Sequence, residues 1–570
     1  MAMEQPIISI KGLTYRYRGQ KRNAIEHVSL DVMPGEFVAI MGASEAGKST
    51  LAACINGLVP HFFRGKFSGE VRVCGKDTRT SRVAEMAEVA GMVFQDFEAQ
   101  LFSTNVELEV AFGLENFNVP RDEIARRVDE ALRFVGLENL KRRSPATLSG
   151  GQKQKLAIAS VLAMYPKVLV MDEPTTDLDP ISKAGVFEIA NHLRQRDDLT
   201  LLVVEHETEE VLEAQKILLL DEGKPIRYAP AHEVLRDVDL LEQHGVMPLG
   251  VTKYFHRMGG NSDTPLTIND GIQRFREEQW QLSDSVYQSL QQQDRTRELR
   301  YGAPLIRCEN LQFAYPNGTQ ALKGIDLEIR RGEMVAIVGQ NGSGKTTLVK
   351  HFNGLLMPTG GQIWVDGRTT REQGVFELGH KVGYVFQNPD HQIFSNTVYD
   401  EVAFTLRLRK VDEKTIRQAV TEALEAVGLA GYENADPFSL TKSGRQRVAV
   451  ASVLAAKPEI LILDEPTTGL DYNEQRSMMN LVRRLNENGS TIIFVTHHMW
   501  VVAEYAHRVY VMKDGQIYLQ GTAREVFSHD QELVDAYLRP PMHVTFANRL
   551  GKTLLTVDEL IACTETTSRE

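Results

Sequence analysis

Two short glycine-rich stretches hold the residues best suited to chemistry in this chain. Gly42–Thr50 reads GASEAGKST, and Gly339–Thr347 reads GQNGSGKTT. The second fits the pattern GxxxxGK[ST] fully, in which backbone N–H groups and a helix N-terminus surround the phosphates of a nucleotide. Lys345 would supply a point charge on the β- and γ-phosphates, and Thr346 a hydroxyl for Mg²⁺. The predicted chemistry is therefore the binding of a nucleoside triphosphate.

An acidic pair follows a short apolar run in each half of the chain. Asp464-Glu465 comes directly after Leu461–Leu463, and Asp172-Glu173 takes the same place in the first half. Such an apolar run predicts a buried strand, which would place the carboxylates at its C-terminal end, beside the glycine-rich loop. Asp464 would hold the water shell of the metal, and Glu465 would polarise the attacking water. An isolated acidic pair is more often a solvated turn, but its repetition in register favours the catalytic interpretation.

The chain is an internal duplication. Lys48 and Lys345 are 297 residues apart, whereas the two VFQ stretches and the two DEP stretches are each 292 residues apart. The difference indicates a longer loop in the first half, around Val59–Gly69. The repeat extends beyond these motifs, because Pro248–Thr252 matches Pro541–Thr545 and Leu266–Asp270 matches Leu555–Glu559. Each half therefore has its own small C-terminal element.

Domain limits follow from this repeat. Thr267, with Asp270 three residues later, predicts a helix cap, and apolar residues continue at near-helical spacing to Leu290. The polar stretch from Gln291 to Gly302 is the expected linker. Apolar, β-rich runs alternate with helical patterns in both halves, which predicts a mainly parallel sheet flanked by helices. The predicted divisions are 1–245 and 304–538 for the two large domains, 246–290 and 539–570 for their C-terminal elements, and 291–303 for the linker.

Composition narrows the class of protein. A formal net charge of −12 argues against a general nucleic-acid binder. The four cysteines are far apart, with no CxxC pair, which suits a reducing compartment. No run approaches the roughly 20 apolar residues that a membrane span needs, and the N-terminus has no signal-peptide core. We therefore expect a chain that serves a membrane, if at all, from outside the bilayer.

The stretch Leu148–Gln152 (LSGGQ) precedes the first acidic pair by about 20 residues and resembles the signature motif of ABC ATPases. Gln95, Gln387, His206 and His497 also match that family, so the resemblance covers nearly the whole chain. It implies an α/β fold of two tandem P-loop ABC nucleotide-binding domains, each with a helical signature subdomain and a small C-terminal helical element. It also implies head-to-tail pairing, in which the phosphate loop of one half and the signature of the other grip the same ATP.

Residue roles come from the same resemblance. Tyr17 and Tyr315 look like the aromatics that stack on adenine, the two glutamines would sense the metal and the γ-phosphate, and the two histidines look like γ-phosphate switches. The expected ATP-binding residues are Tyr17, Gly42, Ala46, Gly47, Lys48, Ser49, Thr50, Ser149, Gly150, Gly151, Gln152, Tyr315, Gly339, Asn341, Gly342, Ser343, Gly344, Lys345, Thr346 and Thr347. Those expected at Mg²⁺ are Ser49, Gln95, Asp172, Thr346, Gln387 and Asp464. The expected catalytic residues are Glu173, His206, Glu465 and His497.

Within that family, the chain is most similar to the ATPase components of energy-coupling-factor (ECF) importers of vitamins and metal ions. The stretches Leu101–Val106 (LFSTNV), Ile393–Val398 (IFSNTV) and Glu401–Phe404 (EVAF) carry this similarity, as does the Pro-x-x-Val-Thr element in both halves. The implied partners are integral membrane subunits for transport and substrate binding, with the chain peripheral on the cytoplasmic face of the membrane. Docking would involve Phe102 and Phe394, which could equally be core residues.

The two ATP sites are not expected to be equal. Ser44-Glu45 replaces Asn341-Gly342, which brings a carboxylate near a polyphosphate. The ungapped partner of Leu148–Gln152 is Leu440–Gly444 (LTKSG). A two-residue shift would recover SGxQ, but it would turn the following helix by about 200° and exchange its buried and exposed faces. Head-to-tail pairing would collect both changes in one site, so we expect one hydrolytic site and one slow or ATP-holding site.

Two other functions share these motifs. A soluble twin ABC protein acting on ribosomes or DNA would be expected to carry a long basic arm or a cysteine-rich zinc module, and neither is present in the sequence. An exporter motor has the same catalytic motifs, and only the ECF similarity argues against it. No residue of the chain indicates which substrate is transported.

Overall fold

The computed structural model describes residues 5–175, 183, 185–186, 189, 192, 199–260 and 263–566. The chain divides into two compact units. The first comprises Met1–Thr252 and Gly260–Leu266, and the second comprises Lys253–Gly259 and Thr267–Glu570. Among the described residues, no helix has the length and apolar character needed to cross a bilayer.

A six-stranded sheet forms the centre of the first unit, in the order β10-β9-β3-β8-β7-β6. All neighbours pair in parallel except β10 and β9. Strands β3, β7 and β8 are buried along their whole length, as expected for a sheet covered on both faces. The parallel sheet predicted from the sequence is therefore confirmed. Its strands are β3 (Phe37–Gly42), β6 (Ala90–Val93), β7 (Val168–Asp172), β8 (Thr200–Val204), β9 (Lys216–Asp221) and β10 (Lys224–Pro230).

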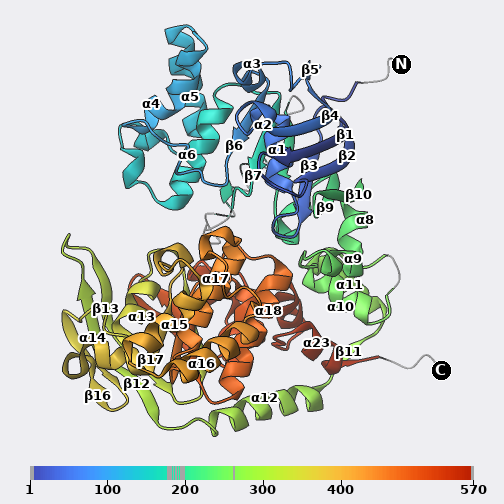
Figure 1. The fold of residues 1–570 in the computed structure, drawn as a ribbon. Coiled ribbons are helices and arrows are strands. Elements are labelled where there is room, and N and C mark those ends of the chain that lie inside the picture. The colour runs from blue at the N-terminus through green and yellow to red at the C-terminus, as the bar shows by residue number, and fades with distance from the viewer. Residues whose placement is uncertain are drawn as a thin grey trace. The chain divides into compact units, whose positions relative to one another are not determined.

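A second, antiparallel sheet of the first unit has the order β2-β1-β4-β5. Buried and exposed residues alternate along β2 (Ile25–Val32), which is the pattern of a sheet with one face on the core. In Figure 1, β1, β2 and β4 lie on one side of the unit, and helices α4, α5 and α6 lie on the other.

The remaining strands are β1 (Ile8–Tyr17), β4 (Gly65–Val73) and β5 (Lys76–Asp77). The helices are α1 (Lys48–Ile55), α2 (Leu58–His61), α3 (Val83–Ala87), α4 (Val106–Asn116), α5 (Arg121–Phe134), α6 (Gly150–Leu162), α8 (Ala231–Arg236) and α9 (Val238–Gln243).

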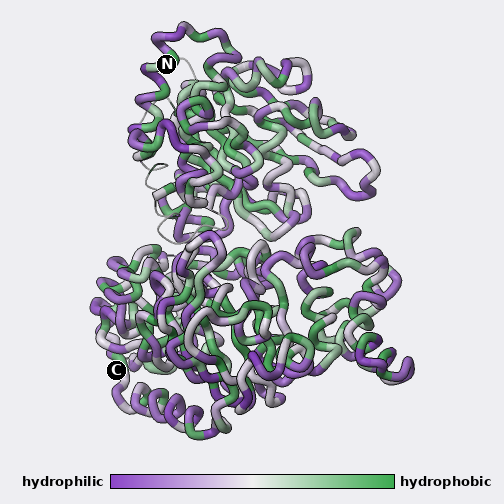
Figure 2. The backbone as a smooth tube through the Cα atoms, turned by 90° about the vertical axis from the view of Figure 1, so that its left-hand side faces the viewer, coloured by the Kyte–Doolittle hydropathy of each residue, from purple (hydrophilic) through white to green (hydrophobic). Residues whose placement is uncertain are grey.

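The second unit repeats both sheets with the same strand order. Its six-stranded sheet is β17-β18-β19-β14-β20-β21, and its antiparallel sheet is β13-β12-β15-β16. Figure 2 shows hydrophobic stretches inside each unit and hydrophilic ones along the outer loops and helices. The strands are β12 (Pro304–Ala314), β13 (Gln320–Arg330), β14 (Met334–Gly339), β15 (Gly360–Val365), β16 (Arg368–Thr369), β17 (Val382–Val385), β18 (Ile460–Asp464), β19 (Thr491–Val495), β20 (Arg508–Lys513) and β21 (Gln516–Thr522). The helices are α13 (Lys345–Phe352), α14 (Thr370–Lys381), α15 (Val398–Leu408), α16 (Glu413–Ala426), α17 (Lys442–Leu454), α18 (Tyr472–Glu487), α19 (Met499–Tyr505), α20 (Ala523–Phe527) and α21 (Asp530–Asp535).

Both halves end in a small helical element, as the repeat predicted. The predicted cap at Thr267 is confirmed, because its side chain accepts a hydrogen bond from the backbone N–H of Asp270. Thr556 caps the second element in the same way. These elements comprise α10 (Gly250–Arg257) and α11 (Ile268–Glu277) in the first half, and α22 (Met542–Arg549) and α23 (Val557–Cys563) in the second.

The helical spacing expected to continue to Leu290 does not form one helix. Helix α11 ends at Glu277, and Gln279 has φ +57°, a left-handed conformation that stops a helix. The chain then forms strand β11 (Gln281–Leu282) and starts again as α12 (Asp284–Glu298). Most of the stretch expected as a linker is thus the second part of α12.

Much of the C-terminal element of the first half, namely Lys253–Gly259 and the residues from Thr267 onward, belongs to the second unit. Strand β11 pairs antiparallel with β22 (Thr564–Glu565). The hydroxyl of the buried Tyr254 lies 2.9 Å from that of Thr564. Rings from both elements contact one another, namely those of Tyr254, Phe255, Phe275, Trp280 and Phe546.

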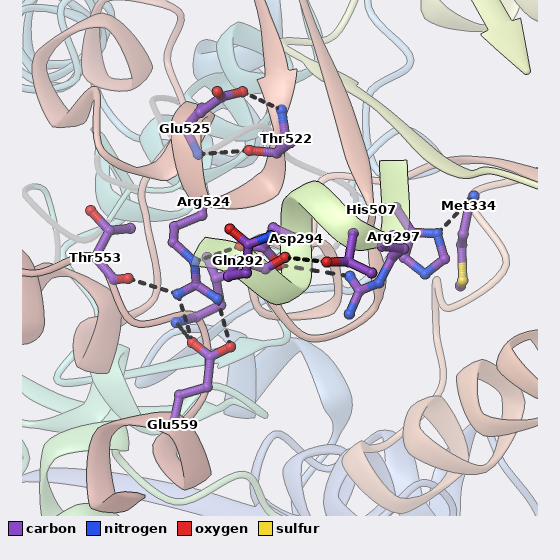
Figure 3. A network of polar contacts seen from close by, with 12 residues as sticks. Gln292, Asp294, Arg297, Met334, His507, Thr522, Arg524, Glu525, Thr553 and Glu559 are labelled. Atoms are coloured by element: carbon purple, nitrogen blue, oxygen red, sulfur yellow. Dashed lines mark hydrogen bonds and ion pairs between the residues drawn. The ribbon is translucent and has the colours of Figure 1, made fainter. Parts of the chain in front are cut away.

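Helix α12 lies within the second unit and is held there by ion pairs. Buried Arg524 donates to Asp294 of α12 at 2.7 Å, and makes two hydrogen bonds of 2.8 and 2.9 Å to Glu559 of α23 (Figure 3). Lys552 pairs with Asp284 at the start of α12. Because charged hydrogen bonds are strong, the pairs made by Arg524 hold α12 and α23 in one geometry.

Candidate functional site

The glycine-rich loop of the second half joins β14 to α13. A Cβ on Gly339, whose φ is +148°, would lie 2.2 Å from the carbonyl oxygen of Met512, so only glycine fits there. Helix α13 begins directly after Gly344, with Lys345 at its first position. The Lys345 amine donates to the carbonyl oxygens of Gly339 and Gln340 at 2.8 and 3.0 Å. The loop thus wraps around a lysine amine at a helix N-terminus, the arrangement that binds phosphates.

The first half builds the same loop with one difference. Lys48 donates to the carbonyl oxygens of Gly42 and Ala43 at 3.0 and 2.7 Å. Glu45 is exposed and has φ +61°, whereas the matching residue of the second half is Gly342, with φ +80°. A left-handed conformation costs a residue other than glycine about 1 kcal/mol. The first loop therefore holds a strained backbone and a carboxylate where the second has neither.

A hydroxyl and a carboxylate meet at the start of each loop helix. Ser49 donates to Asp172 at 3.1 Å, and Thr346 donates to Asp464 at 3.1 Å. Oxygen donors of this kind suit Mg²⁺, which takes its remaining ligands from phosphates and water. The described residues contain no cluster of three or more His, Cys, Asp or Glu side chains able to hold a metal by themselves.

Each acidic pair ends in a glutamate that contacts a histidine. In the second unit, Glu465 Oε2 lies 2.9 Å from His497 Nδ1. In the first, Glu173 Oε1 lies 2.6 Å from His206 Nε2, and Gln95 donates to Glu173 Oε2 at 2.7 Å. Both glutamates have left-handed backbones, with φ +47° and +52°. Strain at matching positions in both units is typical of functional residues.

Burial controls the electrostatics of the acidic pairs. Burial and the neighbouring Glu173 raise the pKa of Asp172 to about 6. Burial also raises the pKa of Asp464. For Glu465, burial alone would raise the pKa, but His497 and Lys345 outweigh it and leave the pKa below its ordinary value. Glu465 is thus held as a carboxylate, the form that can orient and polarise a water molecule.

Tyr384 distinguishes the second acidic pair from the first. Its buried hydroxyl donates to Asp464 Oδ2 at 2.7 Å, in addition to the bond from Thr346 to Oδ1. Burial and Asp464 raise the pKa of this hydroxyl, so it stays protonated as a donor. The matching residue of the first unit is Met92 on β6, which has no hydroxyl. Asp464 is therefore fixed through both carboxylate oxygens, and Tyr384 was not among the predicted site residues.

Both signature stretches begin helices of 13 residues. Ser149 caps α6, where its hydroxyl accepts from the N–H of Gln152 and Gln152 Oε1 accepts from the N–H of Ser149. Thr441 caps α17 by accepting from the N–H of Gly444. Because the caps are 292 residues apart, the ungapped register predicted from the sequence is confirmed. Gly444 has no side chain to complete the reciprocal bond that Gln152 makes.

The two aromatic residues expected at adenine occupy matching places. The hydroxyl of Tyr17 lies 3.1 Å from Thr50 Oγ1, and that of Tyr315 lies 2.9 Å from Thr347 Oγ1. Tyr17 is partly exposed at the end of β1, and Tyr315 is exposed directly after the end of β12. Both therefore lie next to a glycine-rich loop, where a nucleobase would follow the phosphates.

Comparison with known proteins identifies the family. The family profile described as ABC transporter matches residues 25–176 and again 322–468. A protein of Caldanaerobacter subterraneus subsp. tengcongensis, named provisionally as an ABC transporter ATP-binding protein, is 54% identical over 568 residues, covering 99% of this chain and 100% of its own length. The chain belongs to the ABC transporter family.

Other relatives of this ABC ATPase span similar lengths. A protein of Methanosarcina acetivorans with the same provisional name is 40% identical over 570 residues, covering 98% of this chain and 93% of the relative. Among solved structures, cbiO1 of Clostridium perfringens, described as part of the ABC transporter complex cbiONQ, is 40% identical. It covers 41% of this chain and 93% of its own, with a TM-score of 0.38. The family profile in both halves and the full-length relatives identify the chain as a tandem ABC ATPase that binds and hydrolyses ATP, in a family that works with membrane components.

Each ABC unit brings most of its predicted residues together. In the second, the loop of Gly339–Thr347, the acidic pair and His497 lie at the C-terminal ends of β14, β18 and β19. The first unit does the same with Gly42–Thr50, Asp172, Glu173, Gln95 and His206. The signature residues Ser149–Gln152 lie apart from these, at the start of α6.

Substitutions at Glu45 and Gly342 test the effect of the extra carboxylate. We expect Glu45→Gln to raise the ATP affinity of the first ABC unit about fivefold, because it removes a like charge worth about 1 kcal/mol near the phosphates. Gly342→Glu should lower the affinity of the second unit by a similar factor, because it places a carboxylate at the matching position; the side chain would meet no atom within 4 Å, and φ +80° would strain its backbone as at Glu45. Fluorescent-ATP titration in a Glu465→Gln background measures both. If neither substitution changed the ATP affinity, the proposed repulsion between the Glu45 carboxylate and the phosphates would be contradicted.

Proposed function

We propose that this chain is the motor subunit of an ECF-type importer for a vitamin, vitamin precursor or metal ion, bound to the cytoplasmic face of the cell membrane. Its two halves would form an intramolecular pseudo-dimer with two composite ATP sites. One site would join Gly339–Thr347 to Ser149–Gln152 and hydrolyse ATP. The other would join Gly42–Thr50 to Leu440–Gly444 and hold ATP with slow or no turnover.

The hydrolytic assignment follows from the groups around Glu465. In this proposal Glu465 accepts a hydrogen bond from the attacking water, while His497 contacts both Glu465 and the γ-phosphate. Lys345 and the loop N–H groups stabilise negative charge on the transferred phosphoryl group. Thr346 and Asp464 would hold Mg²⁺, which would neutralise charge on the β- and γ-phosphates.

The proposal of unequal ATP sites rests on three differences between the two units. Tyr384 fixes Asp464 in the second unit, and Met92 leaves Asp172 without that bond. Glu45 changes the first loop, and Gly444 removes the reciprocal cap from the second signature. Head-to-tail pairing would place all the weaker parts in one site. Because the first unit retains the Glu173–His206 contact, we propose slow turnover there rather than failure to bind ATP.

Docking of membrane subunits is proposed at one aromatic pair in each unit. Phe102 is 62% exposed and Phe394 60% exposed, so neither is a core residue. Phe102 contacts Phe112 of α4 with ring centroids 4.5 Å apart, and Phe394 contacts Phe404 of α15 at 4.7 Å. Exposed aromatic pairs are typical anchors for a partner helix.

A buried glutamate fixes the loop that holds each of the two exposed phenylalanines, Phe102 and Phe394. Glu109 Oε2 accepts from the backbone N–H groups of Phe102 and Ser103 at 3.0 and 2.7 Å. Glu401 makes the matching bonds to Phe394 and Ser395 at 3.1 and 2.9 Å. Because both carboxylates are 3% exposed, the bonds are shielded from water and hold the phenylalanines outward. Both glutamates begin the Glu-Val-Ala-Phe stretch that is repeated in the two halves, so the sequence already marked them as matching positions.

Purification in mild detergent tests the proposed assembly. We expect integral membrane proteins to co-purify with the chain, and the double substitution Phe102→Ser/Phe394→Ser to reduce their recovery at least about tenfold, since it removes the two exposed aromatic anchors that a partner would bury. Tyr432→Ser, at an exposed aromatic elsewhere on the second unit, is the control and should retain them. Recovery of ribosomes instead of membrane proteins, or equal losses in both variants, would contradict the proposal.

A further inference from the structure

Strands β1 and β4 end together at one tip of the first unit. Tyr17 pairs with Gly65, and Arg16 pairs with Lys66. The backbone N–H of Arg18 donates to the carbonyl oxygen of Arg64 at 3.1 Å. The turn from β1 to β2 returns at the same end, because Ala24 donates to the carbonyl oxygen of Tyr15 at 2.8 Å. The two loops therefore form one projecting surface.

Six cationic side chains gather on this surface, which we name the basic tip: Arg16, Arg18, Lys21, Arg22, Arg64 and Lys66. Five are exposed, and Arg16 is partly exposed. Across the described residues, no carboxylate lies within ion-pair distance of any of these six. Such a cluster is unusual in a chain whose formal net charge is −12.

Two phenylalanine rings lie beside these cations. Phe62 is 73% exposed and Phe63 is 41% exposed, and their ring centroids are 5.1 Å apart. The hydroxyl of Tyr15 donates to the carbonyl oxygen of Phe63 at 2.8 Å, which fixes the backbone of this loop. The rings are therefore held at the surface by a structured backbone.

The second half has no equivalent of the basic tip. Ala314 and Pro316 take the places of Arg16 and Arg18. Strand β15 begins only at Gly360 and has six residues, whereas β4 has nine. Arg64 and Lys66 lie in the longer loop predicted around Val59–Gly69, whereas Arg16, Arg18, Lys21 and Arg22 lie at or just after the end of β1, next to Tyr17.

We propose that the basic tip binds the anionic headgroup surface of a lipid bilayer. Cations without intramolecular partners gain about 1 kcal/mol each near an anionic membrane. Aromatic rings beside them can enter the interface between headgroups and acyl chains. The binding goes beyond docking to membrane subunits, because it needs no protein partner and uses residues outside the aromatic pairs.

Co-sedimentation of the full chain with lipid vesicles tests the proposal. We expect at least tenfold more binding to vesicles containing phosphatidylglycerol than to pure phosphatidylcholine vesicles, with loss of binding at high salt. Arg64→Glu/Lys66→Glu should abolish the preference, and Phe62→Ser should weaken binding severalfold. The control Lys414→Glu/Arg417→Glu makes the same charge change on exposed positions of α16 and should bind as the unmodified chain does.

Thermal unfolding and ATP binding of each variant show whether the fold is intact. Equal binding to both kinds of vesicle would overturn the proposal, as would equal losses in the tip and control variants. If a single-stranded RNA oligonucleotide binds more tightly than the vesicles, and loses binding in Arg64→Glu/Lys66→Glu, the basic tip recognises nucleic acid and the lipid proposal is wrong. Failure of membrane subunits to co-purify would leave this vesicle result unaffected, so the two proposals fail independently.

Discussion

Replacing Glu465 with glutamine is expected to lower ATP turnover by at least about 10²-fold, because an amide polarises the attacking water far less than a carboxylate does. Glu465 is buried, kept ionised by His497 and Lys345, and held in a left-handed backbone conformation. Glu173→Gln should leave more than about half of the turnover, since the first site contributes little hydrolysis in our proposal. Steady-state phosphate release from the full chain, reconstituted with its membrane subunits, measures both.

The same two variants provide the control for ATP binding. Glutamine has nearly the volume of glutamate and accepts the same backbone conformation, so each variant should still bind ATP. Equal losses of turnover in Glu465→Gln and Glu173→Gln would show two equivalent hydrolytic sites and contradict the assignment. Greater loss in Glu173→Gln would reverse the roles of the two units.

Substitutions at the two signature helices should have very different effects on turnover. In the proposed composite site, Ser149 meets the ATP held by Lys345, so Ser149→Arg should lower turnover about 10²-fold by displacing the nucleotide from its reactive geometry. Thr441→Arg would disturb only the ATP-holding site and should leave most of the turnover. Phosphate release again provides the measurement.

Thr441→Arg is also a matched structural control. Ser149 and Thr441 both cap helices of 13 residues, so both substitutions lose a cap worth about 1 kcal/mol. Their unfolding temperatures should therefore fall by similar amounts. A nucleotide-trapped structure in which each unit binds ATP with no contribution from the other would refute the shared-site proposal, whatever the kinetics show.

Much of each candidate site could be predicted because local sequence determines it. A glycine is required where the loop backbone touches a neighbouring strand, as at Gly339, and an acidic pair after an apolar run predicts carboxylates at a strand end. The helix caps at Thr267 and Thr556 could also be predicted, since a cap depends on residues three apart. The duplication then allowed each motif to be checked against a second copy.

Other features depend on contacts between distant residues. Tyr384 lies 80 residues from Asp464, and nothing local in the sequence shows that its hydroxyl would reach that carboxylate. The break after α11 also escaped prediction, because apolar residues on either side of Gln279 keep a helical spacing while the pairing of β11 with β22 stops the helix. The exposure of Phe102 and Phe394 depends on buried glutamates seven and six residues away along the chain from the N–H groups they bind.

The pairing of β11 with β22 has a consequence for how the two ATPase halves come together. Part of the first half's C-terminal element is folded into the second unit, where β11, Tyr254 and α12 all make contacts. If the two halves pair across shared nucleotides as proposed, each closure would be a unimolecular step at a high effective concentration. Dilution of the protein should not slow the cycle, in contrast to ATPases that must find a separate partner chain by diffusion.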